Sequence, residues 1–200
     1  MAKDHWENVY ATKGHAEVSW TEDEPTRSLA LIAGVCPPPG RVIDVGGGTS
    51  ALGGRLLDAG YRVAVLDISE AALSRSRERL GARAEDIQWA VADITSNPDL
   101  GQFDVWHDRA VFHFLTDPAD RAAYVSLLRR TVPVGGHAVI ATFAPDGPEQ
   151  CSGLEVRRYD GPSLAAELGA GFALISSTGE AHLTPWGKPQ SFQYSLFRRV

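Results

Sequence analysis

The sequence predicts an α/β protein with a doubly wound, mostly parallel sheet that ends in an antiparallel β-hairpin. Between residues 41 and 143, short β-branched runs alternate with longer helical segments, which is typical of parallel strands joined by covering helices. After these, the segments 172–180 and 190–199 both read as strands, and no helical pattern separates them. Two successive strands without a crossover helix are expected to pair antiparallel.

Local signals place each element in turn. The predicted strands are short runs rich in β-branched and aromatic residues, and the first five cover 41–45, 61–66, 87–91, 103–107 and 136–143. The predicted helices begin near capping residues or prolines, and they cover 4–11, 25–35, 51–60, 69–80, 118–131 and 162–168. Ser69 and Asp117 are the expected N-caps, while Gly60 and Gly81 follow helix ends.

The chain length and composition suit one domain of ordinary size. Of its 200 residues, 44% are hydrophobic and 22% are charged. A chain of this length buries roughly 70% of its unfolded surface, so it needs no disulfide or metal in order to fold. We therefore expect residues 1–200 to form one domain, with a helical N-terminal cap (1–35), a central core (41–145) and a C-terminal helix and hairpin (160–200).

The charge and the cysteines exclude several classes of function. The formal net charge of −6 argues against a nucleic-acid partner, because phosphate binding requires a basic face. Cys36 and Cys151 are far apart and lack metal-ligand spacing, which indicates two free thiols and no metal site. No apolar run approaches the ~20 residues of a membrane span, and the first residues lack a signal-peptide core. We expect a cytoplasmic protein without a membrane partner; its oligomeric state is not specified by these features.

A glycine-rich loop follows the first predicted strand. Gly46, Gly47 and Gly48 lie between that strand and the next helix, where the backbone can turn sharply and a ligand can approach it closely. Asp67 ends the second strand, and a carboxylate there can accept hydrogen bonds from a ribose diol. These features alone fit NAD as well as other adenosine cofactors.

Three further features favour S-adenosylmethionine as the cofactor. Asp44 lies two residues before Gly46, where its charge would repel a pyrophosphate but attract an ammonium and a sulfonium. Asp93 closes the third strand and can accept from an adenine amino group. The chain ends after the hairpin, without the substrate domain that many dehydrogenases carry.

These segments together resemble the successive motifs of the class I S-adenosylmethionine-dependent methyltransferases. The motif-bearing segments are 42–50, 65–69, 91–94 and 103–109. The resemblance covers about residues 40–145, and the final hairpin is similar to the sixth and seventh strands of that family. It implies a Rossmann-like, seven-stranded sheet. Ser50 departs from the family loop, which often has a third glycine at this position.

Within that family, the chain is similar to a bacterial subgroup. The similarity lies in Glu17-Val18-Ser19-Trp20 and in the segment from His182 to Phe192. It does not specify the molecule that is methylated.

The resemblance implies cofactor-binding roles for residues in these motifs. Residues expected near the amino-acid part of the cofactor are Asp44, Gly46, Asp108 and Arg109. Residues expected along the ribose and adenine are Gly47, Gly48, Asp67, Ile68, Asp93 and Ile94. Trp20, with Trp6 and Tyr10, is expected either to cover the cofactor or to anchor the N-terminal helix.

The candidate catalytic bases are histidines and a tyrosine: His107, His113, His182 and Tyr194. His113 follows the fourth strand close to the expected methyl group, although it could equally be packed among aromatic residues. His182 lies in the predicted hairpin loop, where acceptors often enter, although a structural role in a capped loop is favoured. Methyl transfer is an in-line displacement, so the protein mainly supplies alignment and desolvation.

Several functions remain open at this level. The compact length favours a small-molecule acceptor, while a protein lysine methyltransferase and a non-catalytic cofactor-binding protein are alternatives. The fourth strand is followed by Asp108-Arg109-Ala110-Val111 rather than the Asn-Pro-Pro-Tyr of many nucleic-acid and glutamine methyltransferases. An NAD-dependent oxidoreductase is disfavoured by Asp44.

Overall fold

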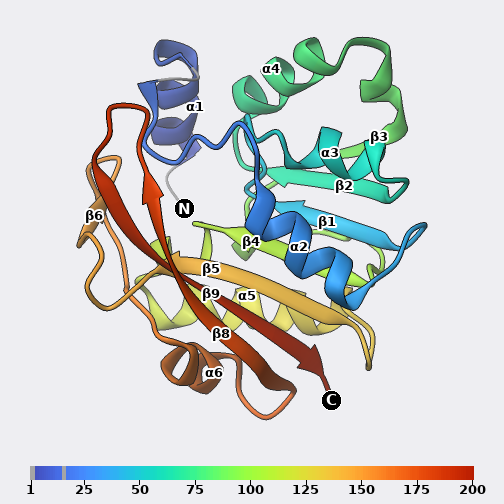
Figure 1. Cartoon of the computed structure of the whole chain (residues 1–200), viewed down its shortest axis with the longest axis vertical. Helices are drawn as coiled ribbons and strands as arrows, with labels where there is room; N and C mark the ends of the chain where they lie inside the picture. The colour runs from blue at the N-terminus through green and yellow to red at the C-terminus, as the bar shows by residue number, and fades with distance from the viewer. Residues whose placement is uncertain (1–2, 15–16) are drawn as a thin grey trace.

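A seven-stranded sheet forms the centre of the computed structural model (Figure 1). The strands are β1 (Arg41–Val45), β2 (Arg62–Asp67), β3 (Ile87–Val91), β4 (Val105–Arg109), β5 (His137–Phe143), β8 (Phe172–Leu183) and β9 (Pro189–Arg199). Their order is β3-β2-β1-β4-β5-β9-β8. The first five are parallel, and β9 runs antiparallel to both of its neighbours, which confirms the predicted fold.

The structure describes residues 3–14 and 17–200. The expected N-terminal cap, residues 1–35, includes four residues (1, 2, 15 and 16) that lie outside the described part. None of the helices within the described ranges is long and apolar enough to cross a membrane.

Helices cover both faces of the sheet. On one face, α2 (Thr26–Val35), α3 (Leu52–Asp58) and α4 (Glu70–Leu80) pack on Val42, Val105 and Val139 of the strands. On the other face, α5 (Pro118–Thr131) and α6 (Gly161–Leu168) pack on Ile43, Trp106 and Ile140. Figure 1 shows α2 in front of the sheet and α5 behind it, and α1 (Lys3–Thr12) beside α4. Strand alternation therefore decides which helix layer each side chain meets.

The fourth strand begins and ends two residues later than the sequence predicts. The prediction was 103–107, whereas β4 covers Val105–Arg109. Its register pairs Asp44 with His107 on one side and Ala141 with Arg109 on the other. Asp108 and Arg109 are thus strand residues that point to opposite faces of the sheet.

The C-terminal hairpin is longer than predicted, and a second hairpin is added. β8 and β9 pair as far as Leu183 and Pro189, which leaves a short turn instead of the expected nine-residue loop at 181–189. A small sheet of β6 (Gln150–Cys151) and β7 (Leu154–Glu155) lies between β5 and α6 in sequence and was not predicted. Two-residue strands are too short to carry a periodic signal.

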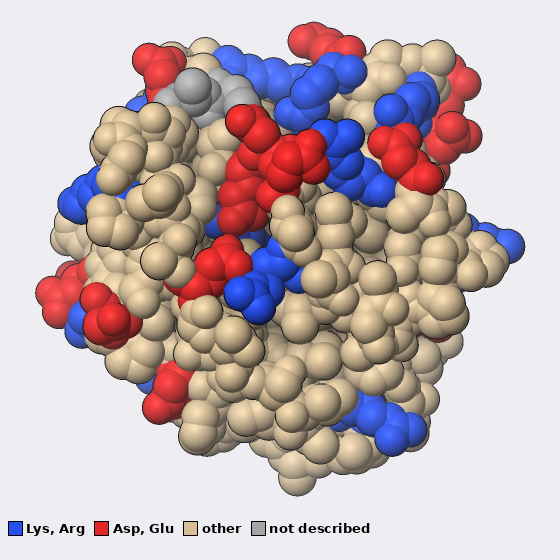
Figure 2. All heavy atoms as spheres, in the orientation of Figure 1, with Lys and Arg blue, Asp and Glu red and all other residues tan. Residues whose placement is uncertain are grey.

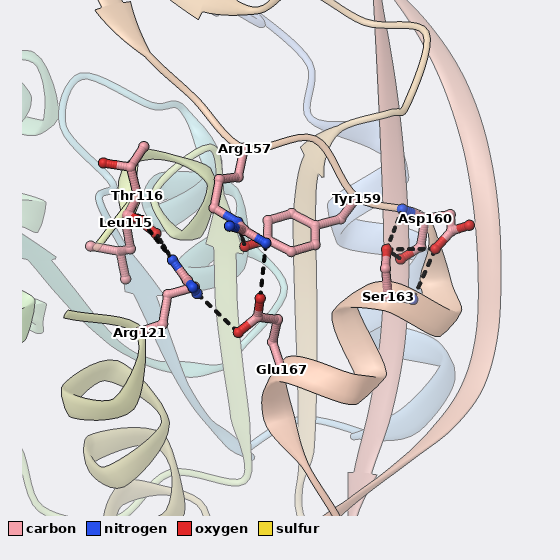
Figure 3. Close-up of polar contacts among 8 residues, drawn as sticks. All are labelled: Leu115, Thr116, Arg121, Arg157, Tyr159, Asp160, Ser163 and Glu167. Atoms are coloured by element: carbon pink, nitrogen blue, oxygen red, sulfur yellow. Dashed lines mark hydrogen bonds and ion pairs between the residues drawn. The ribbon is translucent and has the colours of Figure 1, made fainter. Parts of the chain in front are cut away.

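A polar network joins α5, α6 and the segment after β7 (Figure 3). Arg121 of α5 donates to the carbonyls of Leu115 and Thr116 at 2.9 Å each and to Glu167 of α6 at 2.9 Å. Arg157 donates to the other Glu167 oxygen at 3.2 Å. The network fixes the chain immediately after η4 (Phe112–Phe114), the short helix that follows β4.

Charged side chains of both signs share the face seen in Figure 2. Asp and Glu side chains gather near the middle of this face and are bordered by Lys and Arg side chains. Ion pairs such as Arg27 with Glu180 and Arg55 with Glu24 join residues distant in sequence. Such exposed pairs contribute little to stability individually.

Candidate functional site

Two cavities lie at the carboxyl ends of β1, β2 and β4, where open α/β sheets bind ligands. The aromatic cavity, of about 620 Å³, is lined on one side by Trp6, Tyr10, Trp20 and Phe114. The polar cavity, of about 500 Å³, is lined by residues that include Glu22, Ser28, Asp44, Thr49 and His107. Tyr10, Trp20, Gly46 and Arg109 line both cavities, so the two adjoin.

The wall of the aromatic cavity is a cluster of rings. The Trp6 ring meets the rings of Trp20 and Phe114 edge-on, with centroids 5.8 Å and 5.0 Å away. Tyr10 meets Trp20 in the same manner at 6.2 Å. Edge-to-face pairs of this kind stabilise packing beyond the area that they bury. The sequence left open whether Trp20 covers the site or anchors α1. In the structure, Trp20 lines both cavities and also packs against Trp6 and Tyr10 of α1.

Asp67 closes β2 at the floor of the aromatic cavity. Its Oδ1 accepts from the Ser69 amide at 2.8 Å, and the residue is only 6% exposed. Burial raises the pKa of this carboxyl to about 7, although hydrogen bonds from backbone amides oppose the shift. Ile68 and Ile94 line the same cavity.

Asp93 lies beside this cavity, at the start of η3 (Ile94–Ser96). Its Oδ1 accepts from the Thr95 amide at 2.8 Å and from the Thr95 hydroxyl at 2.7 Å. These bonds lower the pKa of Asp93 although burial opposes them. They also fix the turn that presents Ile94 to the cavity.

The glycine loop brings its backbone against both cavities. Gly46 and Gly48 have φ of +67° and +45°, a region that favours glycine. A Cβ on Gly46 would lie 2.0 Å from Val111 Cγ2, and one on Gly48 would lie 2.7 Å from the Tyr10 hydroxyl. A Cβ on Gly47 would lie 2.8 Å from Asp44 Oδ2. Any side chain at these three positions would therefore displace a cavity residue.

A chain of three buried polar side chains forms the base of the polar cavity. His107 Nδ1 lies 2.8 Å from Asp44 Oδ1, and His107 Nε2 lies 2.8 Å from Ser28 Oγ. Asp44, His107 and Ser28 are 3%, 2% and 1% exposed. The other carboxylate oxygen, Asp44 Oδ2, is buried and has no hydrogen-bond partner among the described residues.

Arg109 joins the N-terminal segment to the C-terminal hairpin. Its guanidinium donates to the Trp20 carbonyl at 2.8 Å and to the Tyr194 hydroxyl at 2.9 Å, and it lies 2.9 Å from Glu22 Oε1. It also lies 4.6 Å above the Phe192 ring. Burial alone would raise the pKa of Glu22, but His182 and Arg109 together lower it. The segment around Trp20 is thereby held over both cavities.

His182 lies in β8 rather than in the predicted hairpin loop. Its Nε2 is 2.7 Å from the Ser19 carbonyl, its Nδ1 is 3.6 Å from Glu22, and it is 6% exposed. The loop expectation was wrong because the strand pairing continues to Leu183. His182 therefore holds the N-terminal segment in place and lies behind the cavity wall.

His113 and Asp108 are both packed into the interior. His113 is fully buried between Phe114 and Phe143, and burial lowers its pKa to about 3. Asp108 accepts from the Tyr124 hydroxyl at 2.6 Å and from the amides of Val111 and Phe112. Asp108 points toward α5 because it alternates with His107 and Arg109 along β4. Neither side chain is among the described residues that line the two cavities.

Ser28 and Glu22 are among the residues of the polar cavity that sequence reasoning missed. Helix periodicity could have placed Ser28 on the inner face of α2, one turn before Ile32. No local pattern marks Glu22, because its partners come from β4 and β8. Within the described ranges, no group of three or more His, Cys, Asp or Glu side chains could hold a metal ion.

Comparison with known proteins finds a family match in the central part of the chain. Residues 42–136, which carry the glycine loop and Asp67, match the family described as methyltransferase domain. The match agrees with the family resemblance inferred from the sequence.

Two curated relatives are similar to this chain over most of its length. An eEF1A lysine and N-terminal methyltransferase from Danio rerio is 28% identical over 148 residues, which are 72% of this chain and 21% of the relative. Nodulation protein S from Rhizobium tropici is 28% identical over 144 residues, which are 70% of this chain and 56% of the relative. The match thus spans about a fifth of the first relative and just over half of the second.

Solved structures of methyltransferases share the fold of this chain. The N-methyltransferase NodS from Bradyrhizobium japonicum, in complex with S-adenosylhomocysteine, superposes with a TM-score of 0.76 and 18% identity, covering 99% of this chain and 98% of that one. A 1,6-didemethyltoxoflavin N1-methyltransferase from Burkholderia thailandensis superposes with a TM-score of 0.72 and 20% identity, covering 100% of this chain and 84% of that one. At such identities the likeness concerns the fold.

Proposed function

We propose that this protein is a class I S-adenosylmethionine-dependent methyltransferase that transfers a methyl group to a nitrogen atom of a small molecule. The observation that carries the proposal is the position of Trp20. It lines both cavities and is held there through its carbonyl by Arg109. A site covered in this way has room for a small acceptor but little for a folded protein surface.

The polar cavity fits the amino-acid part of S-adenosylmethionine. Asp44 Oδ2 is a buried carboxylate oxygen without a hydrogen-bond partner among the described residues, which is costly unless a ligand supplies a donor. An ammonium group supplies both a donor and the opposite charge. Gly47 leaves the space beside this oxygen free of a side chain. Arg109, which lines both cavities, is proposed to lie near the cofactor carboxylate.

The aromatic cavity fits the adenosine part. Asp67 would accept hydrogen bonds from the ribose hydroxyls, for which its ionised form is required. Gly48 would pass beneath the ribose, and Ile68 and Ile94 would pack against the adenine. Asp93 would accept from the adenine amino group.

The chain's own contribution to the reaction is alignment and exclusion of water. Bound S-adenosylmethionine supplies a methyl carbon that is made electrophilic by its sulfonium. Trp6, Tyr10, Trp20 and Phe114 would keep water from the junction of the two cavities and confine the acceptor there. Removal of solvent from this junction strengthens the attraction between Asp44 and a bound ammonium.

The placement of the histidines favours a nitrogen acceptor. His113 is neutral at neutral pH and buried away from both cavities, and both nitrogens of His182 face the N-terminal segment. A hydroxyl acceptor usually requires a positioned base, whereas an unprotonated amine or ring nitrogen already offers a lone pair. Two of the fold neighbours, NodS and the toxoflavin enzyme, are N-methyltransferases by name.

Calorimetric titration with S-adenosylhomocysteine, and with NAD in parallel, tests the cofactor. We expect micromolar binding of the first and none of the second. Incubation with S-adenosylmethionine and a panel of small amines, N-heterocycles, phenols and thiols, followed by mass spectrometry, tests the acceptor. A methyl group gained only by phenols or only by thiols would refute the nitrogen assignment.

A second candidate function is methylation of protein lysine. The observation that favours it is the similarity to the lysine and N-terminal methyltransferase of Danio rerio. The same assay with a lysine-rich protein in place of the small-molecule panel distinguishes the two. Methylation of the protein and of no small amine would replace our proposal with this one. Binding of S-adenosylhomocysteine with methylation of neither would favour a cofactor-binding protein without catalysis.

A further inference from the structure

We propose that His107 and Ser28 are positioning residues that orient Asp44 toward the cofactor amine. This inference rests on the proposed role of Asp44. None of the roles derived above uses His107 or Ser28, although both are nearly fully buried and line the polar cavity with Asp44. Buried polar groups of this kind are retained where they are fully hydrogen-bonded to one another.

The hydrogen-bond directions follow from the chemistry of the three groups. A carboxylate only accepts, so His107 Nδ1 carries the proton and donates to Asp44 Oδ1 at 2.8 Å. In the neutral ring, Nε2 then accepts from the Ser28 hydroxyl, also at 2.8 Å. The Asp44 carboxylate thus selects the tautomer of His107, the Ser28 hydroxyl holds the imidazole ring in place from its other side, and His107 fixes the rotation of the Asp44 carboxylate. One oxygen is occupied, and Oδ2 remains for a ligand.

The fold explains why these residues meet. Asp44 and His107 are register partners on the adjacent parallel strands β1 and β4, so their side chains leave the sheet on the same face. That face is covered by α2, whose buried side is marked by Ser28 and Ile32. The series of hydrogen bonds therefore runs from Ser28 of α2 through His107 of β4 to Asp44 of β1. It connects the helix layer to Asp44 Oδ2, the oxygen that remains for a ligand.

The same three residue types form the catalytic triad of serine hydrolases, but the surroundings exclude that reading. A hydrolase needs free backbone donors to stabilise an oxyanion near the serine. The amides of Gly46 and Gly47, which line this cavity, already donate to the Leu66 carbonyl at 2.7 Å and 3.2 Å. The available acceptor is Asp44 Oδ2, which suits a cation instead.

Binding of two ligands tests whether His107 and Ser28 position Asp44 or only stabilise the fold. S-adenosylhomocysteine contains the amine that Asp44 would bind, whereas 5′-methylthioadenosine has the same adenosine and thioether without the amino-acid part. We expect His107→Leu to weaken binding of S-adenosylhomocysteine about tenfold or more, the loss of a hydrogen bond to a charged group, measured by calorimetry. Binding of 5′-methylthioadenosine should stay within about twofold, because its contacts lie in the aromatic cavity.

His107→Asn is the matched rescue variant. The asparagine amide can take the place of Nδ1–H and donate to Asp44, so we expect it to recover most of the affinity for S-adenosylhomocysteine. Ser28→Ala retains the imidazole but removes the partner that holds the ring in place, and we expect a loss of about threefold for S-adenosylhomocysteine alone. If His107→Leu fails to fold, the Ser28→Ala and His107→Asn results decide the question in the same two titrations.

Each outcome has one meaning. An equal loss of both ligands in His107→Leu and Ser28→Ala, or no loss of either, would overturn the positioning role. Failure of the unmodified protein to bind S-adenosylhomocysteine would instead refute the proposed cofactor geometry. Selective loss of S-adenosylhomocysteine, recovered by His107→Asn, is the expected result.

Discussion

The two cavities hold their carboxylates in different ways. In the aromatic cavity, Asp67 ends β2 and is held by the backbone amide of Ser69. In the polar cavity, Asp44 lies within β1 and is held by the side chain of His107, with one oxygen without a partner among the described residues. Backbone amides are present whatever the sequence, whereas a side-chain partner requires specific residues on two further elements. The amino-acid end of the site therefore depends more on tertiary structure than the adenosine end.

The largest expected effect is that of Asp44→Asn. The substitution removes the negative charge while keeping the size of the side chain. We expect affinity for S-adenosylhomocysteine to fall about 100-fold, or ~3 kcal/mol, because a charge-assisted hydrogen bond is lost. Affinity for 5′-methylthioadenosine should be nearly unchanged in the same calorimetric titration. A comparable loss for both ligands would show that the two cavities do not act separately.

The next prediction concerns the pH dependence of Asp67. Its pKa is raised by burial to about 7, above the ordinary value of about 4. The folded protein thus binds a proton more tightly than the unfolded chain. Protonated Asp67 therefore stabilises the folded protein relative to the unfolded chain. This contribution to the free energy of unfolding is fully present below about pH 4 and is lost as the pH rises through about 7. We expect the free energy of unfolding, measured in urea across this range, to fall with rising pH, and to fall less in Asp67→Asn.

Asp108 makes a second contribution to the pH dependence of the unfolding free energy. Burial raises its pKa to about 6 as well, and it should leave a residual slope in the Asp67→Asn variant. Because ribose hydroxyls favour the ionised carboxylate, binding of S-adenosylhomocysteine should weaken below about pH 7 in the unmodified protein. An unfolding profile that is identical in Asp67→Asn would contradict the assignment.

A smaller effect is expected from loosening the segment that covers both cavities. Glu22→Gln removes the charge that faces Arg109 and His182. We expect S-adenosylhomocysteine to dissociate about fivefold faster, or ~1 kcal/mol, in stopped-flow measurements of tryptophan fluorescence. Glu24→Gln is the control, since Glu24 lies in the same segment but pairs with Arg55 on the surface. Equal rates in the two variants would mean that the Glu22 contacts do not hold the cover.

The smallest effect on ligands is expected at His113. His113→Phe keeps a ring between Phe114 and Phe143 but removes the acceptor for the Phe143 amide. We expect a loss of ~1 kcal/mol in unfolding free energy, with both ligand affinities and turnover unchanged. A large fall in turnover without loss of cofactor binding would restore His113 as a catalytic base.

Local patterns in the sequence accounted for most of the fold. The alternation of strands and helices, the caps at Ser69 and Asp117, and the antiparallel hairpin appear as expected. The shift of β4 by two residues was not predictable, because the preceding Phe103 has the same apolar character as a strand residue. The shift matters, since it turns Asp108 from a loop acid into a strand residue that faces α5.

The site was predictable where it depends on one turn of chain. The glycine loop, Asp67, Ile68 and Ile94 each line a cavity, as a motif read along the sequence suggests. The contacts of Arg109 with Glu22 and of His107 with Ser28 were not predictable, since 87 and 79 residues separate the partners in the numbering of the chain. Only the packing of the sheet brings such residues together.

The position of β9 has a consequence for synthesis of the protein. β9 lies between β5 and β8, although it follows both in the chain. While the ribosome is still adding residues 189–199, the edge of β5 lacks its neighbour and β8 has no strand to pair with. Until β9 is present, β8 therefore has no strand through which it can join the five parallel strands. Arg109, which bonds to Tyr194 of β9, receives this partner only at that moment, so the cover over both cavities is assembled last.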